Sequence, residues 1–425
     1  MDEHQSSEQH VVDQGWLTLM GQDRFQPMDR KRCIHGSTCT ATHGETLDMM
    51  VLAPQTAPPQ PLPCKLESHG GHGWDLKISL QHKDFVPMSL ITRRQFHLTA
   101  SLAGLHGIWG CASAQPQNQA LTVGALFAGQ VNDKGFMEAG WRGLERARME
   151  LGVKTQFIDG VPPQKEILMQ SIAQLARSGV DLVIAHGGQN NEACAEIAKT
   201  FPQVKFVVIQ GGVIAPNLSS YEVLQEESAY LAGVLAALTT RTGVVGHMSG
   251  IRVRPGLKGR AAYAAGVKAT NPEVKLLTNF SGHQDDNALS KKVALAQIAS
   301  GADCIFTMLN AGRIGAVEAC REKGIRQIGN VVDWVQTEPQ VFVGSAIADV
   351  SIAVFQAVRD LQANQLALGN IRSVGLKNPQ AVRLTMAADV SASVKQAVAK
   401  VSEDIQAGKV TIPETYNGPE FAKPT

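Results

Sequence analysis

The stretches Asp181–His186 (DLVIAH) and Lys205–Gln210 (KFVVIQ) decide the fold. Each contains a short, unbroken run of aliphatic and aromatic residues with a polar residue at either end. Strands of this kind are buried on both faces, as in parallel sheets that are covered by helices. The two stretches therefore predict an α/β protein with parallel sheets.

On either side of these strands, short apolar runs alternate with segments in which apolar residues recur at the spacing of a helix. The first series of predicted strands is 121–127, 154–158, 181–185 and 205–209, with helices over 133–151, 164–177, 191–200 and 226–240. A second series has strands at 243–248, 274–279, 304–308 and 327–331, with helices over 257–270, 286–300 and 313–323. Two series of similar length favour two lobes, each with a doubly wound parallel sheet, over the alternative of a single (β/α)₈ barrel.

The remaining segments complete the predicted lobes. The strand 341–346 and the helix 350–363 are interpreted as a return to the first lobe, and a last helix over 391–407 ends at Gly408. The predicted first lobe is 120–240 plus 344–375, and the second is 241–343 plus 376–413. Residues 414–425 are predicted to be a tail.

An export signal is predicted well inside the chain. Residues 88–114 contain the pair Arg93-Arg94, a short apolar region and the sequence Ala112-Ser113-Ala114, a pattern typical of a twin-arginine signal peptide. Because such signals act from an N-terminus, residues 1–87 are expected to be an unstructured extension absent from the mature protein. Cleavage after Ala114 predicts a periplasmic protein. The alternative is lipidation of Cys111, which would anchor it to the membrane.

Composition excludes several classes of partner. The 425 residues include 39 Lys and Arg against 38 Asp and Glu, a formal charge of +1, which argues against a nucleic-acid partner. No apolar run reaches the roughly 18 residues that span a membrane. The three cysteines of the predicted lobes, Cys194, Cys304 and Cys320, are expected to be buried free thiols.

Candidate ligand-binding residues follow the predicted strands, because ligands of open α/β sheets bind beyond the carboxyl ends of the strands. These candidates are Asn132, Asp133, Phe136, His186, Gly187, Gln189, Asn190, Gly212, Asn310, Gly312, Asp333 and Trp334. Amides, glycines and flat rings together suit a small neutral heterocycle or sugar. Two alternatives stay open: Asp133 as a helix cap alone, and Trp334 as a core residue.

Motifs for catalysis are absent from the sequence. It lacks a GxGxxG turn after the first strand, a phosphate-binding P-loop, a GxSxG elbow and an HExxH pair. The run His283-Gln284-Asp285-Asp286 is interpreted as a loop with helix-capping aspartates rather than a metal site. The sequence therefore predicts a protein that is not an enzyme and needs no cofactor or metal.

Four segments, in this order, resemble the basic membrane protein family of ABC-transporter solute-binding proteins, which includes purine-nucleoside-binding lipoproteins. They are residues 132–136, 227–233, 242–246 and 311–315, within a resemblance that covers 120–413. It implies the two-lobed type I periplasmic binding protein fold with three crossovers, a monomer that closes around a small solute and docks on an ABC permease in the inner membrane. Among the matched positions, it implies ligand contacts at Phe136, Asp133, Gly312 and Asp333.

Three positions depart from the nucleoside binders of that family. Phe127 and Val331 stand where they carry aspartates, the second of which binds ribose, and Ala348 stands where they carry a lysine. A ribose bound here would keep unpaired hydroxyls, at a cost of a few kcal/mol. We therefore expect a less hydroxylated ligand, such as a free nucleobase. The alternative function is a cytoplasmic ligand sensor on the same fold.

Overall fold

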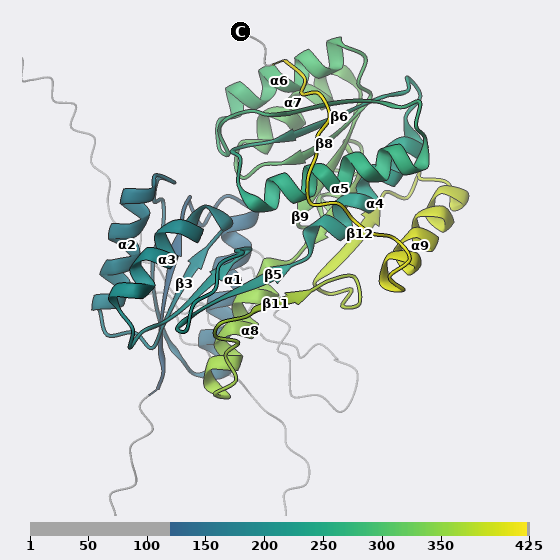
Figure 1. The fold of residues 1–425 in the computed structure, drawn as a ribbon. Helices are drawn as coiled ribbons and strands as arrows, with labels where there is room; N and C mark the ends of the chain where they lie inside the picture. Colours follow the sequence, from purple (N-terminus) through teal and green to yellow (C-terminus); the bar gives the residue numbers. More distant parts are fainter. Residues whose placement is uncertain (1–119, 423–425) are drawn as a thin grey trace, which may run out of the picture. The chain divides into compact units, whose positions relative to one another are not determined.

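The computed structural model describes residues 120–422 of the chain. The predicted extension, the signal peptide and Cys111 lie outside the described residues. The described part forms two lobes, each built on a six-stranded sheet (Figure 1). The α/β class and the two doubly wound lobes that the sequence predicts are confirmed.

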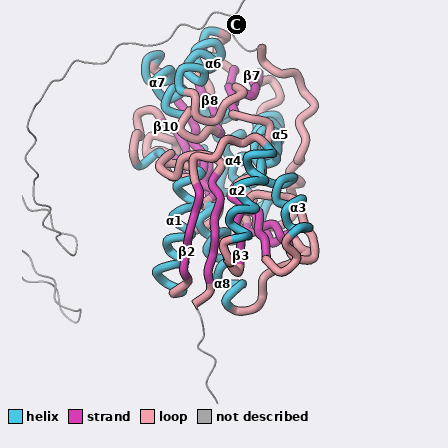
Figure 2. Tube along the Cα trace, turned by 90° about the vertical axis from the view of Figure 1, so that its left-hand side faces the viewer, coloured by secondary structure: helices cyan, strands magenta, loops and turns pink. Residues whose placement is uncertain are grey.

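The first sheet has the strand order β11-β5-β4-β3-β1-β2, and all its neighbouring strands are parallel. Its strands are β1 (Thr122–Phe127), β2 (Lys154–Ile158), β3 (Leu182–His186), β4 (Lys205–Ile209), β5 (Leu218–Val223) and β11 (Ile371–Val374). Its helices are α1 (Phe136–Leu151), α2 (Lys165–Arg177), α3 (Asn191–Thr200) and α8 (Val350–Gln362). Helices α2 and α3 pack together on one face, and α1 and α8 on the other (Figures 1 and 2).

The second sheet has the order β12-β10-β9-β8-β6-β7 and is parallel except for the pair of β10 and β12. Its strands are β6 (Val244–Ser249), β7 (Lys275–Phe280), β8 (Cys304–Met308), β9 (Arg326–Val331), β10 (Phe342–Ala348) and β12 (Val382–Met386). Its helices are α4 (Gln225–Thr239), α5 (Arg254–Thr270), α6 (Asn287–Ala299), α7 (Arg313–Lys323) and α9 (Ala392–Gln406). The pairs α4 with α5 and α6 with α7 pack closely.

Two elements lie in the other lobe from the one predicted. Strand β10 bonds to β9 and β12, so it belongs to the second sheet, and the predicted boundary at residue 344 is wrong. Helix α4 packs against α5, β10 and β12, so the boundary at residue 240 is also too late. Both elements are apolar on nearly every side, and such segments can pack against either sheet. The chain crosses between the lobes before α4, before α8 and between β11 and β12.

The predicted tail packs on the second lobe along the described residues 414–422, where the yellow segment runs back from α9 (Figure 1). The Phe421 amide donates a hydrogen bond of 2.7 Å to the Thr278 carbonyl on the edge strand β7. Glu420 forms ion pairs with Arg252, at 2.5 Å, and with Arg260. This segment therefore covers one exposed edge of the second sheet.

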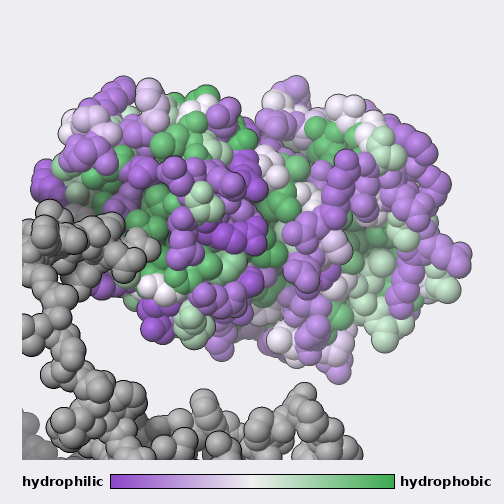
Figure 3. All heavy atoms as spheres, turned by 90° about the horizontal axis from the view of Figure 1, so that it is seen from below, coloured by the Kyte–Doolittle hydropathy of each residue, from purple (hydrophilic) through white to green (hydrophobic). Residues whose placement is uncertain are grey.

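Cys194, Cys304 and Cys320 are buried free thiols, as predicted. Figure 3 shows one face of the molecule, on which hydrophobic patches are small and lie among hydrophilic residues. None of the helices that the structure describes is long and apolar enough to cross a membrane.

Candidate functional site

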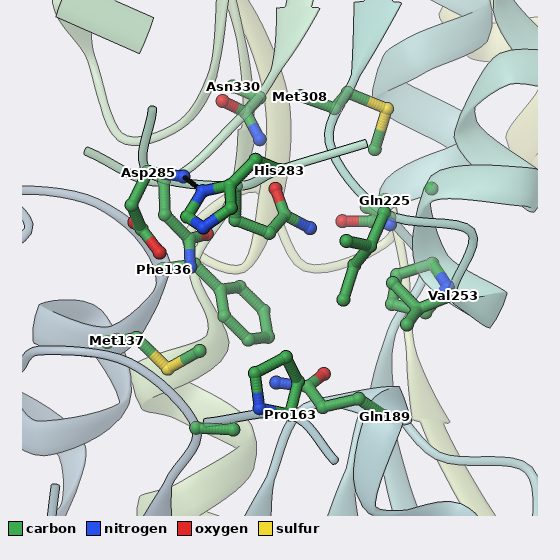
Figure 4. Close-up of a pocket in the computed structure, with 16 residues that line it drawn as sticks. Phe136, Met137, Pro163, Gln189, Gln225, Val253, His283, Asp285, Met308 and Asn330 are labelled. Carbon is green, nitrogen blue, oxygen red and sulfur yellow. Dashed lines mark hydrogen bonds between the residues drawn. The ribbon is translucent and has the colours of Figure 1, made fainter. Parts of the chain in front are cut away.

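A cavity of about 730 Å³, including its open mouth, lies where strand ends of both sheets meet (Figure 4). Residues of both lobes line it: Ala128, Phe136, Met137, Pro163, Gln189, Gln225, Ile251, Val253, Pro255, Gly256, His283, Gln284, Asp285, Met308, Asn310 and Asn330. Apolar and amide side chains dominate this wall.

Phe136, the first residue of α1, turns its ring into the cavity (Figure 4). The His186 ring lies behind it, with the ring centres 4.3 Å apart, and its Nε2 is 2.9 Å from the Phe136 carbonyl. Burial lowers the pKa of His186 to about 4, so this imidazole is neutral at pH 7. A side chain at Gly140 would collide with the His186 ring, so only glycine leaves room for this support. His186 thus holds the aromatic wall and does not line the cavity.

Two glutamines of the cavity wall have buried polar atoms without a partner. Gln225 Nε2 and Gln284 Oε1 make no hydrogen bond to the residues that the structure describes. An unpaired buried donor or acceptor costs about 1–3 kcal/mol, so such atoms need a partner. Gln225 and Gln284 thus each carry a polar atom that lacks a partner among the described residues.

Asp285 is the only carboxylate among the lining residues, which include no lysine or arginine. It accepts a 3.1 Å hydrogen bond from the Ala311 amide, and its own amide donates to His283 Nδ1 at 3.0 Å. Burial, together with the nearby Asp133 carboxylate, raises the pKa of Asp285. A wall with so little charge suits a neutral ligand that carries N–H donors.

Three predicted site residues line the cavity: Phe136, Gln189 and Asn310. Their contact with a ligand stays a prediction. Asn132 is exposed outside the lining. The Asp133 carboxylate is turned away, because it accepts hydrogen bonds of 2.8–3.0 Å from the amides of Gly135, Met137 and Glu138. It caps α1, which explains why this helix begins at Phe136 and not at residue 133 as predicted.

The other predicted residues of the first lobe support the loop after β3 and do not line the cavity. Gly187 adopts a φ of 107°, which favours glycine. The Asn190 amide donates to the carbonyls of His186 and Gly187, at 3.0 and 3.1 Å. Gly212 donates its amide to Asn191 Oδ1 at 3.2 Å.

The predicted residues of the second lobe that lie outside the lining also have structural partners. The Gly312 amide donates to the Gln284 carbonyl at 3.1 Å, where a side chain would collide with backbone. The Asp333 carboxylate accepts from Thr385 Oγ1 at 2.8 Å and from Gln336 Nε2 at 3.1 Å. The Trp334 indole donates to the Asn330 carbonyl at 2.9 Å. The interpretation of Trp334 as a packing residue therefore fits the structure better.

Sequence reasoning missed most of the lining residues. Gln225 begins the crossover helix α4, and Val253 and Pro255 lie at the start of α5. His283 and Asp285 belong to the loop that the sequence predicts correctly to cap α6, through Asp286. The signal that could have found this loop is its position after β7, at the same sheet edge as Asn310 and Asn330. The described residues contain no cluster of three or more His, Cys, Asp or Glu side chains that could hold a metal ion.

The site and the two-lobed fold agree with a match to a family model. The model of PnrA-like ABC transporter substrate-binding proteins, named Bmp, matches residues 120–415, more than half of the chain. The chain belongs to the Bmp family. The resemblance found in the sequence is thereby confirmed, and with it a small-molecule ligand and a transport permease as the partners of the family.

Curated relatives carry more than one function. The nucleoside-binding protein BmpA of Lactococcus lactis is 27% identical over 67% of this chain and 87% of its own length. A purine-binding protein of Brucella abortus is 26% identical over 56% of this chain and 67% of its own. The transcriptional activator Med of Bacillus subtilis is 23% identical over 57% of this chain and 76% of its own.

Solved structures support the fold of this Bmp-family protein. An ABC-transporter solute-binding protein of Aeropyrum pernix superposes with a TM-score of 0.63 at 22% identity. The match covers 70% of this chain and 95% of the other. It confirms the architecture of a type I periplasmic binding protein.

Proposed function

We propose that this protein is the exported solute-binding component of an ABC importer and binds a neutral nitrogen heterocycle, with a free purine base as the best fit. The observation that carries the proposal is the Phe136 ring in the cavity, whose wall also contains the amide side chains of Gln189, Gln225 and Asn330. An aromatic ring stacks on a flat base, and amides recognise its alternating donors and acceptors. The nucleoside-binding and purine-binding relatives support the same ligand class.

A free base fits this wall better than a nucleoside. Val331, which stands where the resemblance implies a ribose-binding aspartate, is 2% exposed and follows Asn330 of the cavity wall. Its φ of 68° is rare for a β-branched residue, and such strained positions cluster at ligand sites. Ala348, at the position of the implied lysine, is also buried. Neither side chain can pair with a sugar hydroxyl.

Export and docking complete the proposal. The twin-arginine pattern at Arg93-Arg94 supports export to the periplasm, as a soluble protein or one lipidated at Cys111. The loaded form then docks on a permease of the inner membrane, as a monomer without catalytic activity. The cavity wall carries few charged groups, which suits binding and release of a solute without chemical change.

Mass spectrometry of the solute released from the purified full chain tests this function. The expected result is a purine base, and thermal-shift assays with purine bases, nucleosides and sugars should show the largest stabilisation with the bases. A ligand that binds only the native state at 100 times its Kd stabilises by about 2.7 kcal/mol. Stabilisation by sugars alone, or by no compound of the three classes, would refute the proposed ligand class.

A ligand-responsive regulator is the second candidate, and the similarity to the activator Med favours it. This function would keep the same cavity but place the protein in the cytoplasm. Fractionation of cells that produce the natural chain separates the two functions. Recovery in the periplasm or membrane supports transport, whereas recovery in the cytoplasm supports regulation.

A further inference from the structure

Arg313, the first residue of α7, joins the two lobes across the cleft without lining the cavity. Its Nη1 donates to the Asp133 carbonyl of the first lobe and to the Asn310 carbonyl of the second, both at 3.0 Å. The side chain is 3% exposed. One guanidinium therefore links the turn before Phe136 to the turn that carries Asn310.

The second lobe holds this guanidinium rigidly in place. The Arg313 guanidinium lies over the Trp334 ring, with its central carbon 3.7 Å from the ring centre. Trp334 is itself fixed by its indole bond to the Asn330 carbonyl and by a 2.9 Å bond from its amide to Ser345 Oγ. Stacking and a planar donor set suit arginine and not lysine. The arrangement connects Asn330 of the cavity wall to Arg313 through Trp334.

The first lobe makes room for the guanidinium at the turn before α1. A side chain at Gly135 would lie 3.2 Å from Arg313 Nη1, tighter than ordinary contact. The Asp133 carboxylate, bound to the start of α1, fixes the carbonyl that Arg313 reaches. Burial lowers the pKa of Arg313 to about 10, so the group stays charged at pH 7.

We propose that Arg313 is a closure latch, a positioning residue that raises ligand affinity by holding the two walls of the cavity together. This inference rests on the proposed function for its ligand. If the lobes separate, the bonds of Arg313 to Trp334 and Asn310 remain within the second lobe, and only the bond to Asp133 is lost. A contact shifts the equilibrium between the open and closed forms only if its free energy differs between them. The bond to Asp133 exists only in the closed form. Arg313 therefore favours the closed form.

The test compares R313M and R313K with R321M in the full chain. Arg321 lies on the same helix but is exposed, in an ion pair of 2.5 Å with Glu338, which makes it the matched control. Calorimetric titration with the purine base released from the wild type should show about a tenfold or greater loss of affinity for R313M. R313K, which keeps a charged donor, should recover part of it, and R321M should bind within twofold of the wild type.

Hydrogen exchange of the ligand-free chain supplies a second measurement. In R313M, peptides over 130–137 and 308–316 should exchange faster, while peptides over the crossover at 222–226 keep their wild-type rate. Unchanged exchange at both turns, or a uniform increase that follows a lower melting temperature, would overturn the latch. If the wild type binds no purine base, while R313M still exchanges faster at the two turns, the proposed ligand class is refuted but the role of Arg313 in closure is supported.

Discussion

The two junctions between the lobes are built from different chemistry. At the cleft, the charged Arg313 meets neutral carbonyls and an aromatic ring. At the crossover, Arg254 and Lys258 of α5 meet carboxylates: Arg254 is 3.1 Å from Glu222 on β5, and Lys258 pairs with Glu226 on α4 and lies 3.7 Å from Glu222. Lys258 also lies 3.3 Å from Glu414 of the C-terminal segment.

The difference indicates which junction opens. Carbonyl groups lose little when water replaces a guanidinium donor, so the cleft contact can break and reform with the ligand. Separation at the crossover would instead leave the buried Glu222 of the first lobe without Arg254 and Lys258 of the second. Burial opposes the charge of Lys258, but Glu226 and Glu222 raise its pKa above the ordinary value. We therefore expect the crossover to stay joined while the cleft opens.

The largest expected effect comes from the ion cluster at the crossover, in which Lys258 and Glu226 pair within the second lobe. K258M leaves the buried Glu226 without its cation, and we expect a loss of about 3–5 kcal/mol in the free energy of unfolding. Urea unfolding of the full chain measures it. The matched control is K268M, at an exposed position of the same helix, which should change stability by less than about 0.5 kcal/mol. Equal losses in the two variants would contradict the buried ion cluster.

Acid should weaken the fold through two buried histidines. Burial lowers the pKa of His247, on β6 in the second lobe, to about 3, and that of His186 to about 4. The unfolded chain binds protons near pH 6.5 and the folded chain does not, so stability is full above pH 6.5 and falls as the pH drops toward 4. Each histidine accounts for about 3 kcal/mol.

The variant H247Q isolates one of these two contributions. His247 contacts Thr278 Oγ1 at 2.8 Å and Ser249 Oγ at 3.2 Å, and glutamine can bond to hydroxyls without titrating. Unfolding free energies at pH 7 and pH 4 should differ less in H247Q than in the wild type, by about 3 kcal/mol. An identical pH dependence in both proteins would show that His247 is not the group that titrates.

A smaller effect is expected from the cavity wall between the junctions. Q225L removes the unpartnered amide, and we expect it to weaken binding of a purine base by about 1–3 kcal/mol while leaving both junctions intact. Calorimetric titration measures the change, with Q380L, at an exposed position of the second lobe, as control. Wild-type affinity in Q225L would exclude this amide from ligand recognition.

The smallest effect is the coupling between the two junctions. R313M and K258M change groups that share no partner in the structure, so their effects on unfolding free energy should add within about 0.5 kcal/mol. A double-mutant cycle by urea unfolding provides the value. A coupling above about 1 kcal/mol would mean that the two junctions act as one unit.

Much of the fold could be predicted from the sequence, because strands such as β3 and β4 are unbroken apolar runs. Three strands were missed for physical reasons. β5 reads Leu-Ser-Ser-Tyr-Glu-Val, with polar residues that are buried only by its neighbours, and β11 is a short, largely exposed edge strand. β12 is also an edge strand, with polar residues in alternation.

The site was harder to predict than the fold. Phe136, Gln189 and Asn310 could be found because they follow the carboxyl ends of strands β1, β3 and β8. Gln225 could not, because its role depends on how the two lobes meet, which no local pattern encodes. The only signal for Gln284 was the position of its loop after β7. Asp133 and Trp334 were predicted to contact the ligand, but in the structure Asp133 caps α1 and Trp334 packs against the Arg313 guanidinium.

We propose that the cavity between the lobes binds a free purine base in preference to its nucleoside. Calorimetric titration of the ligand-free full chain with adenine, guanine and hypoxanthine, and with their ribonucleosides, tests it most directly. The account predicts one site per chain and at least about tenfold tighter binding of one base than of its ribonucleoside, because Val331 and Ala348 leave the sugar hydroxyls unpaired. Tighter binding of every nucleoside, or no binding of any base, would contradict it.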